Sequence, residues 1–318
     1  MISMAYDLAK ISMRPLMRPS FDSSVALARL DERIARSPVG AGLLERQNFA
    51  DACASRWIDG ELVHLEDLVF HDATKDIRTP THELTIARDV LRTRRRITGQ
   101  SPDWALSADG VRSLRKTAEI TTADSEEAQT IGAIRRAATI DPEGEGDDAD
   151  DVENLPGVDY AAIDAVLARS EAAIENATRP GRLFAASLLR QAGVTTGGHL
   201  AAINLGLKII PVDRRRHRDR ETRMLAIAHG LIAAAEIGLK EHDRLALART
   251  LMERRLEGRR TSSKLPELVE LVMAKPLVSA KMVAKTLDVT PQAARRIVLE
   301  LGLREMTGRG RFRAWGVI

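Results

Sequence analysis

Apolar residues recur every three or four positions along most of this chain, with charged residues between them. Such spacing places the apolar side chains on one face of an α-helix and the charged ones on the other. It predicts helices over residues 23–37, 43–58, 65–70, 81–97, 158–176, 180–191, 199–207, 221–238 and 240–256. We therefore expect a mainly α fold in which several helices pack on one another.

The end of the chain, residues 265–318, predicts three further short helices in close succession. The first carries five apolar residues at helical spacing and ends before Pro276. Ser279 is placed to cap the second helix, Ala280 to Leu287, because its hydroxyl can accept a hydrogen bond from a free N–H of the first turn. A break of three residues, 288–290, separates this helix from the third.

The third helix is predicted to begin at Pro291, after the N-cap Thr290, and to run to about Leu301 before Gly302. Four apolar side chains form its predicted inward face: Ala294, Ile297, Val298 and Leu301. The side chains predicted to point outward near its N-terminal end are Thr290, Gln292, Arg295 and Arg296. Two helices around a short break are typical of a helix-turn-helix, in which outward side chains at this place meet the base edges and phosphates of DNA.

Residues 303–315 predict two short strands around a Gly-Arg-Gly turn. This hairpin would hold Arg309 and Arg311 at its tip and Arg313 on the following strand, where they suit a phosphate backbone or a minor groove. Residues 261–318 are therefore predicted to form a winged helix-turn-helix domain that binds double-stranded DNA. Asp288 stands where many such motifs have a glycine, so a structural or protein-binding unit of three helices remains the alternative.

The distribution of charge favours the DNA-binding interpretation. Residues 264–318 contain ten Lys and Arg against five Asp and Glu, whereas the whole chain has a formal net charge of +3. The positive charge is concentrated where phosphates are expected to bind. A second basic run, residues 214–220, holds five arginines. It could also contact DNA phosphates, pair with an acidic segment, or face solvent.

The composition narrows the remaining possibilities. Aromatic residues make up 3% of the chain and hydrophobic residues 44%, so the cores must consist mainly of Ala, Leu, Ile and Val. A single cysteine, Cys53, excludes an intramolecular disulfide and a multi-cysteine zinc site. His64 and His71 lie two helical turns apart, too far to share one metal ion. Charges interrupt the apolar stretches before ~18 residues, and no signal peptide is recognised. We expect a cytoplasmic protein without a membrane span, a metal or another cofactor.

An acidic segment divides the helical part of the chain. Residues 141–154 hold eight acidic side chains and no basic one, and such a segment cannot bury enough apolar surface to order itself. We predict a flexible linker at 141–157 between an N-terminal helical domain, 1–140, and a second helical region, 158–260. The terminal domain, 261–318, follows.

Two segments of the helical part resemble the Fic family of nucleotidyl transferases, helical proteins that often carry a C-terminal winged helix. The first, residues 52–61 with 65–68, is similar to the helix that carries the family's autoinhibitory motif: a serine, three further residues, a glutamate, and then glycine or asparagine. Ser55 and Gly60 match this motif, and Asp59 replaces the glutamate. The second, residues 176–183, resembles the end of the family's catalytic loop, Gly-Asn-Gly-Arg-x-Gly-Arg.

The second segment lacks residues that Fic chemistry needs. The family's loop begins with His-Pro-Phe, whose histidine activates the target hydroxyl, but residues 171–175 here read Glu-Ala-Ala-Ile-Glu. A general base must lie within hydrogen-bonding reach of the proton that it takes. Of the glycines that let backbone N–H groups hold phosphates, Gly181 is left beside Pro180, which has no N–H. We expect no Fic-type transfer, and a catalytically degenerate Fic-type protein is the alternative.

Over nearly its full length, the chain resembles a bacterial family, often plasmid-borne, in which an uncharacterised helical domain precedes a helix-turn-helix. The resemblance implies DNA binding and assigns no catalytic residue. We predict a transcriptional regulator whose multi-helical, Fic-like body supplies dimerisation, partner binding or effector sensing. A homodimer that reads two half-sites is expected, because a small domain with few phosphate contacts binds weakly at physiological salt. An antitoxin-like module that binds another protein is a further alternative.

Overall fold

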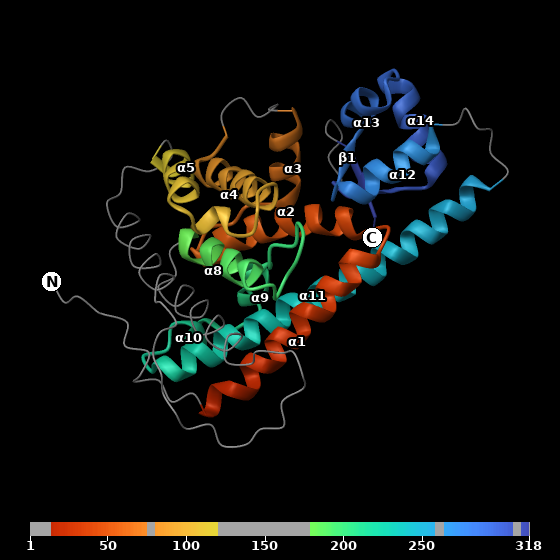
Figure 1. The fold of residues 1–318 in the computed structure, drawn as a ribbon. Coiled ribbons are helices and arrows are strands. Elements are labelled where there is room, and N and C mark those ends of the chain that lie inside the picture. The colour runs from red at the N-terminus through yellow and green to blue at the C-terminus, as the bar shows by residue number, and fades with distance from the viewer. Residues whose placement is uncertain (1–13, 75–79, 120–178, 258–263, 308–312, 318) are drawn as a thin grey trace.

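The computed structural model describes residues 14–74, 80–119, 179–257, 264–307 and 313–317. Helices dominate these residues, which confirms the mainly α fold (Figure 1). The helical body consists of α1 (Arg14–Arg36), α2 (Gly40–Ile58), α3 (Leu65–Thr74), α4 (His82–Thr98), the 3-10 helix η2 (Trp104–Leu106), α5 (Ala108–Glu119), α8 (Arg179–Gln191), α9 (Ile203–Leu207), α10 (Val212–Arg215) and α11 (Arg220–Leu256). The predicted helix 158–176, the predicted linker 141–157 and the three predicted domain boundaries lie outside the described residues.

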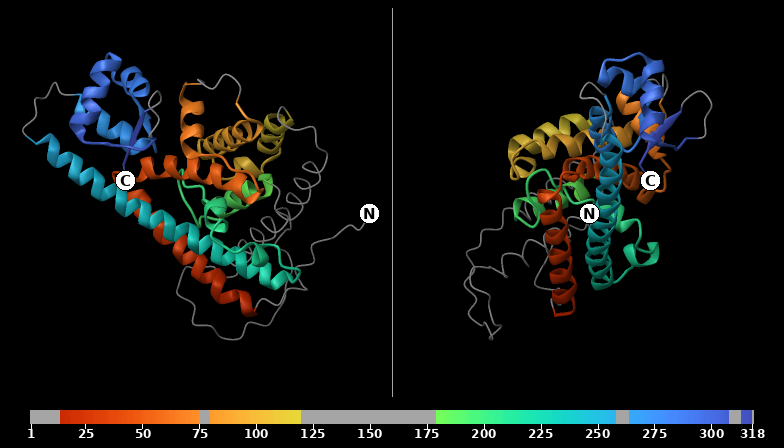
Figure 2. Two further views of the ribbon diagram at one scale, coloured as in Figure 1. Left: turned by 180° about the vertical axis from the view of Figure 1, so that it is seen from behind. Right: turned by 90° about the vertical axis from the view of Figure 1, so that its right-hand side faces the viewer.

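Helices α1 and α11 are the longest of the body and lie side by side (Figures 1 and 2). The sequence predicted two helices, 221–238 and 240–256, but this was wrong, because α11 is one continuous helix of 37 residues. Gly238 does not end the helix, since its missing side chain makes room for its neighbours. A Cβ there would lie 2.5 Å from Cδ2 of Leu30 and 2.6 Å from Nε2 of Gln47. The glycine therefore lets α1 and α2 approach α11 closely.

A buried arginine determines where α9 begins. Arg94 on α4 is 1% exposed and donates hydrogen bonds to Oδ2 of Asp51 (2.7 Å) and to the carbonyl of Leu200 (2.7 Å). The helix predicted over 199–207 therefore begins only at Ile203, because the carbonyl of Leu200 binds the guanidinium instead of a helical N–H.

A second buried polar group joins α1 to the turn that precedes α9. Oδ1 of Asp31 accepts a hydrogen bond from the backbone N–H of Thr196 (2.9 Å) and lies 2.8 Å from Nδ1 of His199. Oδ2 of Asp31 accepts a hydrogen bond from the hydroxyl of Thr196 (2.6 Å). Burial alone raises the pKa of Asp31, but the hydrogen bonds from His199 and Thr196 outweigh burial and hold the pKa below its ordinary value.

Replacing Asp31 with asparagine should make the stability of the protein less sensitive to acid. A carboxyl group whose pKa is lowered by folding contributes stability above its unfolded pKa of about 3.9 and loses that contribution as the pH falls through the folded pKa. Urea denaturation between pH 7 and pH 3 should therefore show a steeper loss for the wild type than for Asp31→Asn. Thr196→Val removes one of the hydrogen bonds and should give an intermediate slope. Identical slopes for all three proteins would contradict the prediction.

The terminal segment combines three helices with a small sheet: α12 (Leu265–Ala274), β1 (Val278–Ser279), α13 (Ala280–Leu287), α14 (Pro291–Leu301), β2 (Arg304–Glu305) and β3 (Ala314–Gly316). The strands are antiparallel in the order β1-β3-β2, with Val278 opposite Trp315 and Arg304 opposite Gly316. The sequence predicted the β2–β3 hairpin but missed β1, which is only two residues long. Trp315 is 4% exposed and belongs to the same core as Val283 and Val298, so the sheet is anchored on the helices.

The terminal segment packs against α2 and α11 of the body (Figure 2). Arg46 on α2 is 6% exposed and donates hydrogen bonds to three carbonyls at the C-terminal end of α12, those of Val272 (2.7 Å), Met273 (3.1 Å) and Lys275 (2.9 Å). The last carbonyls of a helix lack intrahelical partners and carry partial negative charge. Arg46 therefore fixes α12 to the body by satisfying these carbonyls.

Helix α11 is long and apolar enough to be compared with a membrane-spanning helix. It is the one helix of the described residues that is long and apolar enough to cross a membrane, with an 18-residue window of mean hydropathy 1.3. Half of this window is buried inside the protein, and α1 and α9 pack against the helix. A core helix of a water-soluble protein meets the same criterion, so the absence of a membrane span stays a prediction.

Candidate nucleic-acid interface

Helices α13 and α14 pack on each other around a three-residue turn, and side-chain caps fix where each begins. The hydroxyl of Ser279 accepts a hydrogen bond from the N–H of Met282 (3.2 Å), and that of Thr290 accepts one from the N–H of Ala293 (3.2 Å). Both caps and both helix ranges agree with the sequence prediction. The terminal segment is thus a helix-turn-helix.

The turn depends on Asp288 in a conformation that favours glycine. Its φ of 51° lies in the left-handed region, and among the described residues it is the one non-glycine with positive φ. Asp and Asn tolerate this region better than other L-residues do. The N–H of Val289 then bonds to the carbonyl of Ala284 (3.0 Å), which closes the end of α13. The position that weakened the sequence match therefore keeps the backbone geometry of the motif.

Replacing Asp288 with valine should destabilise the terminal segment by about 1–3 kcal/mol, because a β-branched side chain is strained at positive φ. Asp288→Asn is the matched control and should stay within about 0.5 kcal/mol of the wild type. Thermal unfolding followed by circular dichroism measures both changes. Equal stability of the valine and asparagine variants would show that the turn does not require the left-handed conformation.

The far end of α14 is fixed by a glycine and by an arginine of the body. Gly302 adopts a φ of 71°, and a Cβ there would lie 2.2 Å from Nη1 of Arg255. Nη1 of Arg255 on α11 donates a hydrogen bond to the carbonyl of Leu301, and Arg244 on the same helix donates one to the carbonyl of Val317 (3.0 Å). The body therefore holds both α14 and the last strand in place.

The exposed face of α14 carries the side chains that were predicted to point outward. Its four predicted inward residues are buried, and the four outward residues, Thr290, Gln292, Arg295 and Arg296, are exposed. Positions 292, 295 and 296 are three and four residues apart, so they lie on one face of the helix. Their contact with DNA stays a prediction.

The sequence analysis did not single out three further exposed cations of the terminal segment. Lys281 and Lys285 lie one turn apart on α13, and Arg304 lies on β2. In helix-turn-helix proteins the helix before the recognition helix crosses the phosphate backbone. The signal was available, because both lysines fall between the apolar positions of α13. The sequence analysis also did not single out Leu299, an apolar residue that is 67% exposed on the same face of α14 as Arg295.

Of the three arginines that were assigned to the hairpin, the structure describes Arg313. Arg313 precedes β3, and its Nε lies 3.6 Å from Oε1 of Glu305, so an acidic neighbour partly neutralises it. Arg309 and Arg311 lie outside the described residues. The N–H of Met306 donates a hydrogen bond to the carbonyl of Ala314 (2.8 Å) and continues the pairing of β2 with β3.

The basic run at 214–220 lies at α10 and the start of α11. Three of its arginines are exposed: Arg214, Arg216 and Arg218. Arg215 is held in place, since its Nε donates to the carbonyl of Ile210 (2.9 Å) and its guanidinium carbon lies 5.7 Å from the ring centre of Trp57. Burial lowers the pKa of Arg215, and the nearby charges of Arg216 and Arg182 lower it further. Phosphate contact by this run stays a prediction.

The two segments that resemble Fic proteins meet in the structure. Nη2 of Arg182 donates a hydrogen bond to Oδ1 of Asp59 (3.1 Å), and Nη1 of Arg56 donates one to Oδ2 (2.9 Å). Both arginines are buried, at 2% and 6% exposure respectively. The hydroxyl of Ser55 donates to the carbonyl of Ala52 (2.8 Å). Residues 171–178 lie outside the described residues, so the resemblance to Fic proteins stays a prediction.

The structure gives no support for metal or thiol chemistry at the residues that it describes. Among the described residues, no group of three or more His, Cys, Asp or Glu side chains lies close enough together to hold a metal ion. Burial raises the pKa of the Cys53 thiol to about 12, so this thiol stays protonated and unreactive at neutral pH.

Comparison with known proteins agrees with the geometry of the terminal segment. Residues 265–318 match a family model described as an HTH DNA binding domain, and residues 148–257 match a family described as a protein of unknown function (DUF1612). The "Uncharacterized protein y4cF" of Sinorhizobium fredii (strain NBRC 101917 / NGR234) is 64% identical to this chain, and the match covers 99% of this chain and 100% of that protein. The chain therefore carries a DNA-binding helix-turn-helix domain, which follows a part that matches a family of unknown function.

Proposed function

We propose that this protein, which belongs to the same family as the y4cF protein of Sinorhizobium fredii, is a cytoplasmic transcriptional regulator that binds duplex DNA through its terminal segment. The observation that carries the proposal is the exposed face of α14, where Gln292, Arg295 and Arg296 follow a capped N-terminus. In this arrangement α14 enters the major groove, and the N-terminal end of the helix lies near a phosphate. The β2–β3 hairpin serves as the wing, with Arg309 and Arg311 on flanking phosphates or in the minor groove.

The helical body supports this role by holding the terminal segment through its side chains. Arg46, Arg244 and Arg255 bind backbone carbonyls of the segment, so the orientation of α14 depends on these contacts. Two bodies joined as a homodimer would present two recognition helices to two half-sites, which raises both the affinity and the specificity of a small DNA-binding unit.

Selection of bound sequences from random duplex DNA tests the proposed function. Arg295→Ala should relax the preference at one or two base pairs by about 1–3 kcal/mol, because it removes a contact to base edges. Lys285→Ala on α13 should weaken binding to all sequences alike and flatten the dependence of affinity on salt, because it removes a phosphate contact. No enrichment of any sequence, together with no binding at low salt, would overturn the proposal.

One observation favours a second candidate function, nucleotide binding by the body. Arg182 and Arg56 share the single carboxylate of Asp59, and two guanidinium groups suit a phosphate when that carboxylate is removed. Asp59→Ala should then bind labelled ATP more tightly than the wild type in equilibrium dialysis. Failure of both proteins to retain ATP would remove this candidate and leave the DNA-binding proposal unchanged.

A further inference from the structure

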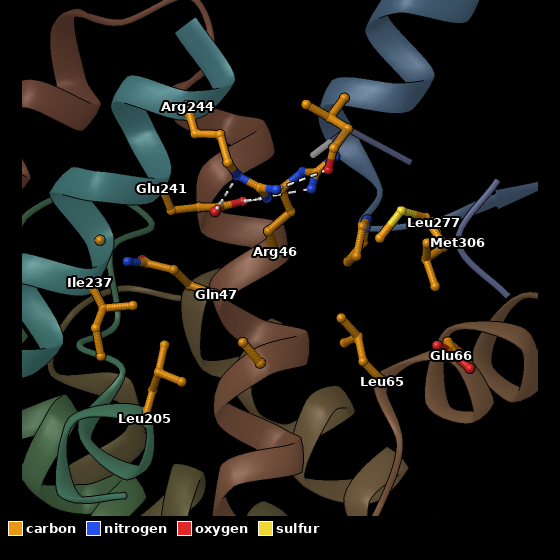
Figure 3. Close-up of a pocket in the computed structure, with 14 residues that line it drawn as sticks. Arg46, Gln47, Leu65, Glu66, Leu205, Ile237, Glu241, Arg244, Leu277 and Met306 are labelled. Atoms are coloured by element: carbon orange, nitrogen blue, oxygen red, sulfur yellow. Dashed lines mark hydrogen bonds and ion pairs between the residues drawn. The ribbon is translucent and has the colours of Figure 1, made fainter. Parts of the chain in front are cut away.

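A cavity of about 370 Å³ lies where the body meets the terminal segment (Figure 3). Its floor is α2, one wall is α11 together with Leu205, and the opposite side is formed by α3 and the terminal segment. Cavities of this size at a junction between structural units are the usual place for small-molecule sites. The terminal segment was assigned above to DNA binding, but this leaves the cavity itself without a role.

Most side chains that line the cavity are apolar, and its charged groups balance one another. The apolar ones are Ala50, Leu65, Leu205, Ile237, Pro276, Leu277, Met306 and Val317. Arg244 donates two hydrogen bonds to Glu241, at 2.9 and 2.5 Å, and Nη1 of Arg46 lies 3.7 Å from Oε1 of Glu241. With Glu66, the lining holds two arginines and two glutamates. An uncharged molecule therefore suits this cavity better than an ion does.

Gln47 is the polar side chain of the lining that lacks a partner. It is 4% exposed, and neither Nε2 nor Oε1 has a hydrogen-bond partner among the residues that the structure describes. Its amide extends from α2 toward Ile237 and Gly238 on α11, beside the cavity (Figure 3). Buried polar groups in folded proteins are nearly always hydrogen-bonded, so an unpaired amide next to a cavity indicates a missing partner. Gln47 is also one of the residues that line the cavity.

We propose that the amide of Gln47 turns toward the cavity and that the cavity binds a small uncharged molecule. This molecule has an apolar body and an amide-like edge, on which an N–H donor stands next to a C=O acceptor. Such an edge pairs with both unpaired atoms of Gln47 at once, because Nε2 donates and Oε1 accepts. The apolar part fills the space between Ala50, Leu65 and Leu277. This site goes beyond the proposed function, and binding to it does not require DNA.

The location of the site couples it to the terminal segment. Leu277, Met306 and Val317 belong to that segment, and the lining residues Arg46 and Arg244 are two of the three arginines that hold its carbonyls. A molecule that binds more tightly to one orientation of the segment shifts the population toward it. The ligand therefore regulates DNA affinity, a step that rests on the proposed function.

Two isosteric probes test the site on the full-length protein by equilibrium dialysis. Biphenyl-4-carboxamide carries the amide edge, whereas 4-acetylbiphenyl replaces its NH₂ group with a methyl group and leaves Oε1 of Gln47 unpaired. The carboxamide should bind the wild type about tenfold or more tightly than the ketone does, and Gln47→Leu should abolish the difference. Equal affinity of the wild type for both probes, or no binding of either, would overturn the proposal.

Substitutions on α2 locate the probe. Ala50→Phe fills the cavity and should lower the affinity for both probes about tenfold or more, whereas Ala41→Phe places the same side chain at an exposed position of the same helix and should change nothing. An unchanged affinity of Ala50→Phe would place the probe elsewhere and overturn the proposal. If Ala50→Phe does not fold, the comparison of the two probes on wild type and Gln47→Leu decides alone.

The coupling is measured separately, with a duplex enriched in the selection experiment. Saturating biphenyl-4-carboxamide should change the affinity of the wild type for this duplex about fivefold or more and leave that of Gln47→Leu nearly unchanged. If the probe binds but the DNA affinity stays the same, the regulatory step fails while the site stands. If the protein without any probe does not bind DNA, the proposed function is overturned. The dialysis experiments with the two probes do not depend on DNA binding, so they still test the site.

Discussion

Replacing Arg94 with methionine should destabilise the protein by about 3–5 kcal/mol, the largest loss of stability that we expect from a single substitution. Arg94 and Asp51 are 1% and 0% exposed, and Nη1 lies 2.7 Å from Oδ2. Methionine fills much of the same space but leaves the carboxylate of Asp51 buried without its counter-charge. The carbonyl of Leu200 also loses its donor. Urea denaturation monitored by circular dichroism measures the change.

The control for this prediction lies on the same helix. Arg92 on α4 is exposed, and Arg92→Met should change the stability by less than about 0.5 kcal/mol. The double variant Arg94→Met with Asp51→Leu should recover part of the loss, because it removes the stranded charge. A loss below about 1 kcal/mol for Arg94→Met would mean that Asp51 finds another partner or that water reaches it.

Reversing the charge of two side chains on α14 should lower the affinity for specific DNA about 100-fold or more. The double variant Arg295→Glu with Arg296→Glu replaces two attractive contacts by two repulsive ones, and a good contact to a base edge is worth about 1–3 kcal/mol. Both residues are exposed and outside the core of the terminal segment, so the fold should persist. Fluorescence anisotropy with a labelled duplex at two salt concentrations measures the loss.

A control of equal charge separates local contact from net charge. Arg18→Glu with Arg29→Glu places the same change on exposed positions of α1 and should lower the affinity far less, because charges beyond a Debye length of about 8 Å are screened at physiological salt. An equal loss for both double variants would show that DNA responds to the charge of the whole protein. The assignment of α14 as the recognition helix would then be wrong.

The terminal segment shows what a sequence predicts well. Helices α13 and α14 begin where Ser279 and Thr290 predict, because the hydroxyl of each residue accepts a hydrogen bond from the N–H three residues later. Buried and exposed sides follow from the repeat of the helix. These signals are local, so they can be recognised in the sequence without knowledge of the fold. The hairpin was predicted as well, but β1 was missed, because its two residues form a strand only by pairing with β3.

The body shows why other features escaped prediction. Gly238 looked like the end of a helix, and only the approach of Leu30 and Gln47 shows that it is a packing position. Arg94 stands in a run of three arginines that would suit a solvated face, yet it is buried against Asp51. Arg46 gives no hint of its role either, since its partners lie more than 220 residues further along the chain.

The sequence by itself determined that the protein is helical and where its DNA-binding motif begins, turns and ends, because caps, apolar spacing and turn residues act within four or five positions. Only the tertiary structure decided which polar groups are buried and which side chains of the body bind the terminal segment. It also decided that a cavity with an unpaired amide beside it lies between the body and the terminal segment. Burial and pairing depend on distant segments that come together in space. The same residue costs free energy in one such environment and stabilises the fold in another.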